Sequence, residues 1–168
     1  CGNPTAFAEL RPGETVLDLG CGGGIDCFLA AKQVGPEGRV IGIDMTPAMV
    51  DLARQNAEKL EAGNVVFKLA QIETLPERDG TVDAIISNCV INLAPDKQQV
   101  FDEAFRVLAP GGRLYVSDIV LTREISPEMA GDWDQWAGCI GGAQLKDVYL
   151  RGVAEAGFTD IEVISDAP

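Results

Sequence analysis

Residues 15–24 read TVLDLGCGGG, and this stretch decides the fold. The apolar run at 15–19 is long enough for a short buried strand, and Gly20 follows it directly. The glycines at positions 20, 22 and 24 permit a sharp turn and a close approach of the backbone to a ligand. A helix is predicted from about Gly24 to Val34, ending at Gly35. This order of strand, glycine loop and helix indicates either a ligand-binding turn or only a tight connection.

The rest of the chain continues the alternation of strands and helices, with no repeat and no low-complexity segment. Further helices are predicted to begin near Thr46, Pro95, Ser126 and Leu145. Further strands are predicted at residues 39–44, 65–69, 82–87, 114–119 and 158–164. Right-handed crossovers then give an α/β fold with a doubly wound, mostly parallel sheet, in one domain over residues 1–168. Ligands of such sheets bind at the carboxyl ends of the strands, near the point where the strand order reverses.

Composition narrows the class of partner. The chain has 168 residues and a formal net charge of −13, from 13 Lys and Arg against 26 Asp and Glu. This charge repels nucleic acid and anionic membranes, and no apolar run reaches the length of a membrane span. The five cysteines contain no Cys-x-x-Cys pair, so reduced thiols in the cytoplasm are expected. Histidine is absent, which excludes Ser-His and Cys-His nucleophile schemes.

The strand at 39–44 ends in Asp44, downstream of the glycine loop. A carboxylate at that place accepts hydrogen bonds from both hydroxyls of a ribose, which indicates an adenosine cofactor. The loop spacing after Asp18 is Gly-x-Gly-x-Gly, whereas dinucleotide-binding loops follow Gly-x-Gly-x-x-Gly. This difference favours S-adenosylmethionine over NAD, and the ammonium group of the methionine moiety would find Asp18 nearby.

Several segments together resemble the successive motifs of class I S-adenosylmethionine methyltransferases: residues 18–24, Asp44, Leu75-Pro76 and residues 108–114. The resemblance implies the Rossmann-like fold of that class. It also implies that Asp44 holds the ribose, that Met45 packs on the adenine, and that Gln71 stands where an acid often meets the adenine amine. The implied cofactor-binding residues are Asp18, Gly20, Gly22, Gly24, Asp44, Met45, Gln71, Ile72 and Asn88.

A narrower resemblance rests on the segments that contain cysteine. Residues 86–97 read ISNCVINLAPDK, residues 26–28 read DCF, residues 136–143 read WAGCIGGA and residues 1–4 read CGNP. Together they resemble the arsenite methyltransferase family. This implies transfer of methyl groups from S-adenosylmethionine to thiol-bound trivalent arsenic, with a thiol reductant of the glutathione or thioredoxin type. The implied catalytic residues are Cys89, Cys139, Cys27 and Cys1.

Elementary chemistry agrees with that resemblance. Trivalent arsenic is a soft centre that selects thiolates. Its lone pair attacks a sulfonium methyl group without loss of a proton, so a site without histidine is no handicap, whereas O- and N-methyltransferases usually need a base. Cys89 lies just beyond a predicted strand end and Cys139 lies in a glycine-rich segment. We expect these two cysteines to be the principal arsenic ligands.

The remaining cysteines are expected to play lesser parts. Cys27 falls in the first turn of a predicted helix, where the helix dipole lowers the pKa of a thiol. It is therefore expected to form a supporting or redox pair with Cys1, and it is a third candidate arsenic ligand. Cys21, inside the glycine loop, is expected to be a small filler.

Two other functions stay open. One is an ordinary small-molecule methyltransferase, acting at oxygen, nitrogen or carbon, whose cysteines are structural. The other is a non-catalytic domain that binds arsenic. The sequence does not fix the oligomeric state, and a monomer is favoured. The chain is expected to be a fragment of a longer protein, because only four residues follow the predicted strand at 158–164. That is too short for the antiparallel seventh strand usual in this class.

Overall fold

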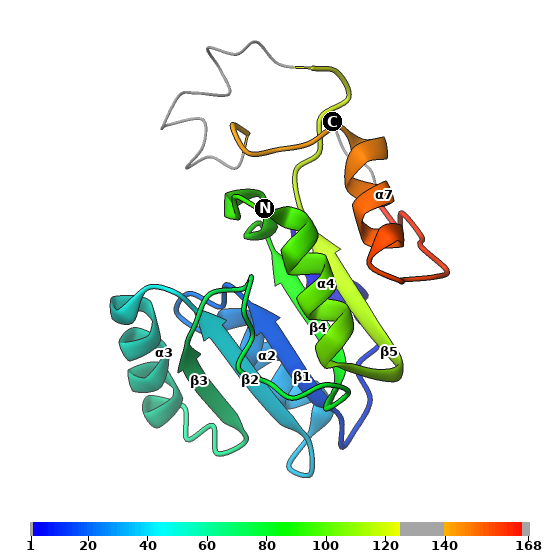
Figure 1. Ribbon diagram of the computed structural model, residues 1–168. Helices are drawn as coiled ribbons and strands as arrows, with labels where there is room; N and C mark the ends of the chain where they lie inside the picture. Colours follow the sequence, from blue (N-terminus) through cyan, green and yellow to red (C-terminus); the bar gives the residue numbers. More distant parts are fainter. Residues whose placement is uncertain (1, 125–139, 166–168) are drawn as a thin grey trace.

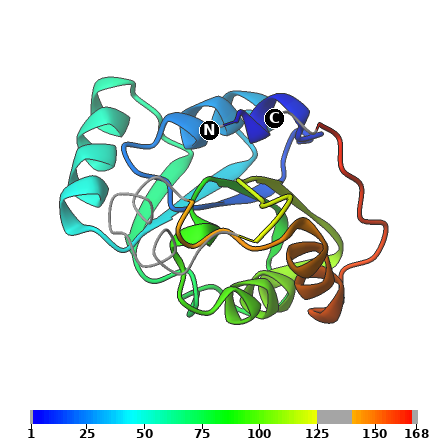
Figure 2. The same ribbon diagram turned by 90° about the horizontal axis from the view of Figure 1, so that it is seen from above.

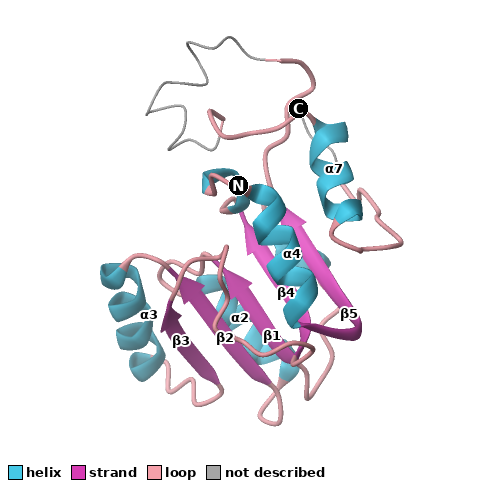
Figure 3. Ribbon diagram, viewed as in Figure 1, coloured by secondary structure: helices cyan, strands magenta, loops and turns pink. Residues whose placement is uncertain are grey.

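The computed structural model describes residues 2–124 and 140–165. Within them, five parallel strands form one sheet in the order β3-β2-β1-β4-β5 (Figures 1 and 3). The strands are β1 (Thr15–Leu19), β2 (Arg39–Asp44), β3 (Val65–Leu69), β4 (Val82–Asn88) and β5 (Leu108–Ser117). The first three agree with the sequence prediction to the residue. The predicted α/β, doubly wound parallel fold is confirmed.

Helices cover both faces of the sheet, as Figure 2 shows from above. On one face, α2 (Ile25–Val34) and α3 (Pro47–Lys59) pack through Ala30, Val34 and Ala53, and α1 (Pro4–Phe7) contacts α2. On the other face, α4 (Lys97–Val107) and α7 (Lys146–Glu155) pack through Phe101 and Tyr149. The short 3-10 helix η1 (Ile91–Leu93) follows β4. Strands β1, β2 and β4 are buried on both faces along most of their length, which explains their nearly continuous apolar sequences.

The strand order reverses between β1 and β4, which are neighbours although two strands separate them in sequence. From β1 the chain winds outward through β2 and β3, then returns to β4 and β5 on the other side of β1. The carboxyl ends of β1 and β4 therefore flank the crevice in which α/β sheets of this kind bind their ligands.

Local signals place several helix boundaries. The carboxylate of Asp96 accepts a hydrogen bond from the backbone N–H of Gln99 at 3.1 Å, so α4 begins at Lys97, two residues after the predicted start at Pro95. Pro47 opens α3, as predicted, although the Thr46 side chain makes no capping hydrogen bond. Strand β5 begins at Leu108, well before the predicted residue 114, because residues 108–112 already run beside β4 with a register shift.

One predicted strand is absent. Residues 158–165 form no strand, and Ile161 and Ile164 are 41% and 56% exposed. The alternation of apolar residues there is real, but a strand exists only where a neighbouring strand accepts and donates its backbone hydrogen bonds. The helix predicted near Ser126 lies outside the described residues. Among the described helices, none combines the length and the apolar character needed to cross a membrane.

Candidate functional site

The glycine loop connects β1 to α2 at the carboxyl edge of the sheet. Its backbone is fixed at both ends: the N–H of Cys21 donates to the carbonyl of Ile43 at 2.9 Å, and the N–H of Gly24 donates to the carbonyl of Cys21 at 2.9 Å. Gly20, Gly22 and Gly24 all have positive φ angles, which L side chains rarely adopt. The loop therefore needs glycine at these three positions for backbone reasons alone.

Only one of the three glycines also borders open space. A Cβ atom at Gly20 would lie 2.3 Å from the side chain of Val90, and one at Gly24 would lie 2.8 Å from Phe67. A Cβ atom at Gly22 would meet nothing within 4 Å. The absence of a side chain at Gly20 and Gly24 makes room for Val90 and Phe67, respectively. Of the three glycines, only Gly22 leaves space that a cofactor could occupy.

Asp44 ends β2 and joins the loop to the next helix. Its Oδ2 accepts from the N–H of Gly22 at 2.9 Å, and its Oδ1 accepts from the N–H of Thr46 at 2.8 Å. Each oxygen keeps a further lone pair for a ligand hydroxyl. Met45, the next residue, is 68% exposed. An apolar side chain so exposed beside the loop is suited to cover a flat ligand ring.

The predicted adenine-side residues lie along the same edge. The N–H of Ala70 donates to the carbonyl of Asp44 at 3.1 Å, which brings the segment after β3 against the end of β2. Gln71 is exposed there, whereas the Ile72 side chain is buried in the core. The side chain of Gln71 is thus accessible to a ligand, whereas Ile72 could contact a ligand only through its backbone.

Asp18 and Cys27 lie beneath the loop and contact each other. Asp18 is 2% exposed, Cys27 is fully buried, and the Cys27 thiol donates to Oδ2 of Asp18 at 3.2 Å. Burial, together with Asp26 and Asp44, raises the pKa of Asp18 to about 8 although the Cys27 hydrogen bond opposes the rise. The predicted lowering of the Cys27 pKa is wrong: its contact with Cys21, burial and the charge of Asp18 all raise it.

Asn88 ends β4 and reaches across to α2. Its Nδ2 donates to Oδ2 of Asp26 at 3.1 Å and to the carbonyl of Gly2 at 3.0 Å. Its Oδ1 is buried and accepts no hydrogen bond from a described residue. Asn88 was predicted to bind the cofactor, whereas its partner Asp26 was not predicted to belong to the candidate site. The one signal for Asp26 is its place as an acidic residue in the first turn of α2.

The cysteines divide into three groups. Cys21 is buried, and its Sγ would lie 2.8 Å from a Cβ atom at Gly42, which agrees with a filler role. Cys27 is buried beneath the loop, and Cys89 is half-buried directly after β4. Cys1 and Cys139 lie outside the described residues. Among residues 2–124 and 140–165, no cluster of three Cys, Asp or Glu side chains could hold a metal ion.

The residues at this edge fit S-adenosylmethionine. Asp18, Asp26 and Asp44 make the region acidic, and the cofactor carries positive charge on its sulfonium and ammonium groups. Gly22 borders open space, Asp44 has free acceptor sites, and the unpaired Oδ1 of Asn88 is a further acceptor. Acceptors and negative charge are what a cationic ligand with hydroxyl groups requires.

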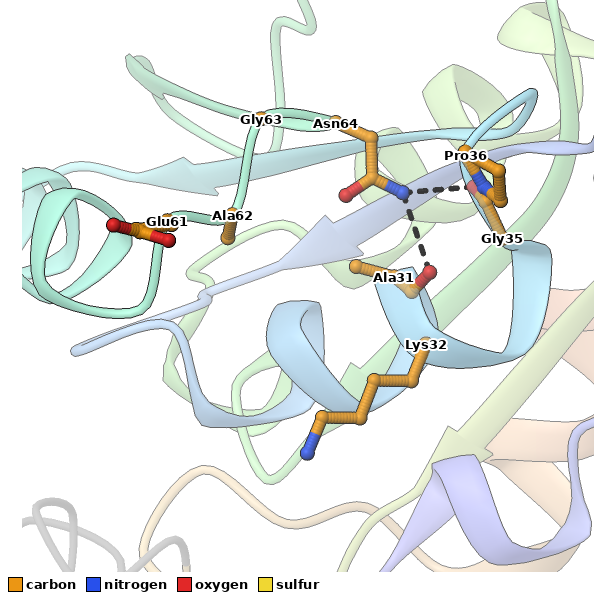
Figure 4. A pocket seen from close by; sticks show the side chains of 8 residues that line it. All are labelled: Ala31, Lys32, Gly35, Pro36, Glu61, Ala62, Gly63 and Asn64. Atoms are coloured by element: carbon orange, nitrogen blue, oxygen red, sulfur yellow. Dashed lines mark hydrogen bonds between the residues drawn. The ribbon is translucent and has the colours of Figure 1, made fainter.

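A depression lies beside the amino ends of the strands, lined by the residues labelled in Figure 4. It is lined by the end of α2 and by residues 61–64, which precede β3. Nδ2 of Asn64 donates to the carbonyls of Ala31 at 3.2 Å and Gly35 at 2.9 Å, and so pairs carbonyl groups at the end of α2. This depression lies at the end of α2, whereas the glycine loop lies at the start of that helix.

Comparisons with known proteins agree with this geometry. Residues 10–157 match the model of a protein family described as a methyltransferase domain. The chain is 53% identical over 163 residues, 97% of its length, to an arsenite methyltransferase from Halobacterium salinarum. It is 44% identical over 137 residues, 76% of its length, to an arsenite methyltransferase from Homo sapiens.

A solved structure is similar as well. The crystal structure of an arsenic(III) S-adenosylmethionine methyltransferase from Chlamydomonas reinhardtii matches 95% of this chain with a TM-score of 0.86 and 39% identity. The chain spans 56% of that structure. It spans 42% of the Halobacterium relative and 36% of the human one.

Proposed function

The chain belongs to the methyltransferase domain family, and from this premise we propose that it binds S-adenosylmethionine and transfers methyl groups to thiol-bound trivalent arsenic. Asp44 would hold the ribose, Met45 and Gln71 would contact the adenine, and Asp18 and Asn88 would face the methionine end. Gly20, Gly22, Gly24 and Ile72 would complete the cofactor site through their backbone. The similarity of this chain to the arsenite methyltransferases described above supports this proposal.

One observation carries the assignment of the substrate. Cys89 directly follows β4, and Val90, its neighbour, packs against Gly20 of the glycine loop. The sulfur of a cysteine therefore lies at the carboxyl edge of the sheet, next to the loop that would hold the cofactor. A soft, thiophilic centre bound by Cys89 would lie where a transferred methyl group is expected.

The chemistry follows from that arrangement. When bound, S-adenosylmethionine would supply an electrophilic methyl group on a sulfonium. The arsenic lone pair would form the new bond to carbon while the carbon–sulfur electron pair leaves with sulfur, so arsenic is oxidised by two electrons. A thiol reductant of the glutathione or thioredoxin type would return it to the trivalent state. Cys89 and Cys139 would hold the arsenic, with Cys27 and Cys1 in supporting roles, in the reducing cytoplasm.

The direct test is mass spectrometry of arsenic species. The protein is incubated with arsenite, S-adenosylmethionine carrying a labelled methyl group and a thiol reductant, and methylated arsenic with the label is expected. Binding of phenylarsine oxide by single Cys→Ser variants then tests the ligands. Cys89→Ser and Cys139→Ser should abolish tight binding, and Cys21→Ser should leave it unchanged. Unlabelled products, or full binding by Cys89→Ser, would contradict the proposal.

A second function is favoured by the burial of Cys21 and Cys27. Cysteines with no solvent access suit an ordinary small-molecule methyltransferase whose thiols are structural. Arsenite distinguishes the two functions: it should be methylated by the enzyme proposed here, and it should neither react with nor inhibit an enzyme that makes no use of its thiols.

A further inference from the structure

The segment from Cys89 to Leu93, here called the Cys89 turn, has a constrained backbone. Cys89 has a φ angle of 57°, in the left-handed region that a side chain with a Cβ atom rarely adopts. Its N–H donates to the carbonyl of Ser117 at the end of β5, at 2.8 Å. Such a conformation costs about 1–2 kcal/mol and persists only where neighbouring contacts hold it.

Asn92 supplies two of those contacts. It is fully buried within the otherwise apolar run of residues 90–93. Its Nδ2 donates to Oδ1 of Asp118 at 2.8 Å and to the carbonyl of Ile119 at 2.6 Å. Its Oδ1 has no hydrogen-bond partner among the described residues. An unpaired buried carbonyl is unfavourable, so stability alone does not explain an amide at this position.

Two further hydrogen bonds hold the Asp118 carboxylate in place. It accepts hydrogen bonds from the backbone N–H of Ile119 at 3.1 Å and from the hydroxyl of Tyr149 on α7 at 3.3 Å. Burial raises its pKa to about 6, which leaves it ionised at neutral pH and a strong acceptor for Asn92. Lys97, at the start of α4, donates to the carbonyl of Asn92 at 3.3 Å. The Cys89 turn is thus fastened to β5, α4 and α7.

The other side of the turn touches the glycine loop. The side chain of Val90 occupies the space that a Cβ atom at Gly20 would need, at 2.3 Å. The position of Val90 therefore depends on the glycine loop, and the position of Asn92 depends on Asp118. Because Cys89 lies between these two attachments, its position relative to the loop depends on both.

We propose that Asn92 and Asp118 are positioning residues that fix the position of Cys89 relative to the cofactor loop. The proposal rests on the proposed function for its consequence, since methyl transfer requires the reacting atoms to lie about 3–3.5 Å apart. Asn92 is fully buried, so it would act through the backbone of the Cys89 turn and not by contact with a ligand. The unpaired Oδ1 is tolerated because the amide's two donors are needed to reach Asp118 and Ile119 together.

The test compares Asn92→Ala with a matched control, Asn64→Ala. Asn64 also uses one amide nitrogen to bind two acceptors, but beside the amino ends of the strands (Figure 4). Three quantities are measured on the reduced protein: the urea midpoint, the affinity for phenylarsine oxide, and the alkylation rate of Cys89 by iodoacetamide, followed by peptide mass spectrometry. Each variant removes two hydrogen bonds, and Asn92→Ala should lose more stability because one of its bonds goes to a buried carboxylate. The urea midpoint of each variant therefore serves to correct the other two quantities for stability.

The two variants should differ at Cys89. Asn92→Ala should bind phenylarsine oxide about tenfold more weakly and alkylate Cys89 several-fold faster, because the turn is released. Asn64→Ala should change neither quantity beyond its effect on stability. In methyl transfer, Asn92→Ala should lower kcat and leave the KM for S-adenosylmethionine unchanged. Equal behaviour of the two variants at Cys89 would overturn the inference.

Two further measurements keep the inference falsifiable. If Asn92→Ala does not fold, Asp118→Asn replaces it, since the neutral amide keeps the shape and weakens the bond to Asn92. The swap of Asn92→Asp with Asp118→Asn should then restore part of the slow alkylation of Cys89, and an unrestored rate would contradict the inference. If the unaltered protein does not bind phenylarsine oxide, the proposed function fails, while alkylation of Cys89 still tests the positioning role.

Discussion

The thiol of Cys27 donates a hydrogen bond to Oδ2 of Asp18, 3.2 Å away, with both side chains buried beneath the glycine loop. The pairing stabilises the carboxylate form of Asp18, but burial and the charges of Asp26 and Asp44 outweigh it, so the pKa of Asp18 rises to about 8. Asp18 is thus mostly protonated at pH 7 when no cation is near. A ligand that brings positive charge to this edge would remove that proton.

Cofactor binding should therefore release protons. At pH 7 the binding of S-adenosylmethionine should lower the pKa of Asp18 and release close to one proton per site. Calorimetry in phosphate and in Tris buffers measures this, because the two buffers take up protons with different enthalpies. Asp18→Asn cannot ionise and should abolish the difference between the buffers. The same apparent enthalpy in both buffers for the unaltered protein would contradict the prediction.

The same group predicts how stability depends on pH. The unfolded pKa of an Asp is about 3.9, below the folded value of about 8, so folding favours the protonated form. The stability that Asp18 contributes is fully present below about pH 4 and is lost as the pH rises through about 8. Without cofactor, Asp18→Asn should be more stable than the unaltered protein at pH 9 and nearly equal to it at pH 4, where Asp18 is protonated in the folded state and close to half-protonated in the unfolded state. Urea unfolding at the two pH values measures this, and an equal loss of stability with pH in both proteins would refute it.

Asp44 should contribute more to cofactor affinity than to folding. Asp44→Ala removes the acceptor proposed for the ribose, and a hydrogen bond to a charged group contributes about 1.5–3 kcal/mol, so the Kd should rise about 10- to 100-fold. Asp51→Ala is the matched control, because Asp51 is an exposed carboxylate paired only loosely with Arg54 at 3.6 Å. Its Kd should not change. Calorimetry of both variants checks the prediction, which an unchanged Kd for Asp44→Ala would exclude.

Substitutions of Gly22 and Gly20 should have different effects on the free energy of unfolding and on cofactor affinity. Gly22→Ala forces a Cβ atom into a positive φ but meets no neighbour, so the free energy of unfolding should fall by about 1–2 kcal/mol while cofactor affinity falls strongly. Gly20→Ala should destabilise much more, because its Cβ atom would lie 2.3 Å from Val90. Urea unfolding and cofactor titration measure both effects. Equal stability of the two variants would show that Val90 moves aside without cost.

The sheet was predictable because its signals are local. Strands β1, β2 and β3 are short apolar runs between turn residues, and their boundaries agree with the prediction. Residues 158–164 show the same kind of apolar run, yet they form no strand. Periodicity reports which residues prefer burial, whereas a strand also requires a partner distant in sequence. That requirement cannot be read from the segment itself.

The site was predictable in part for the same reason. Asp44 is the last residue of β2, Met45 comes next, and Gly22 lies shortly after β1. The topology alone brings these residues to one edge of the sheet. The burial of Cys27 against Asp18 was missed, because helix position says nothing of what covers a side chain. Asn92 and Asp118 were missed as well, and the one available signal was a polar residue inside an apolar run.

Arg106 on α4 holds the connection between β3 and β4, which includes Gln71. Its guanidinium binds the carboxylate of Glu103 through two nitrogens, at 2.6 and 2.8 Å. It also donates to the carbonyls of Leu75 at 3.1 Å and Glu77 at 2.9 Å. Glu103 in turn accepts from the N–H of Leu75 at 2.8 Å. The connection is thereby attached to α4 along several residues.

Replacing this guanidinium by an ammonium tests whether the attachment supports cofactor binding. Arg106→Lys keeps the charge but cannot reach the carboxylate and both carbonyls together. The Arg106 side chain is partly exposed, so the expected loss of unfolding free energy is only about 1–2 kcal/mol. The Kd for S-adenosylmethionine should rise, because Gln71 and Ile72 belong to the loosened connection. Arg54→Lys, on exposed α3, alters one hydrogen bond to the carbonyl of Phe67 and should change the Kd less. Equal changes in Kd for the two variants would mean that the connection keeps its place without Arg106.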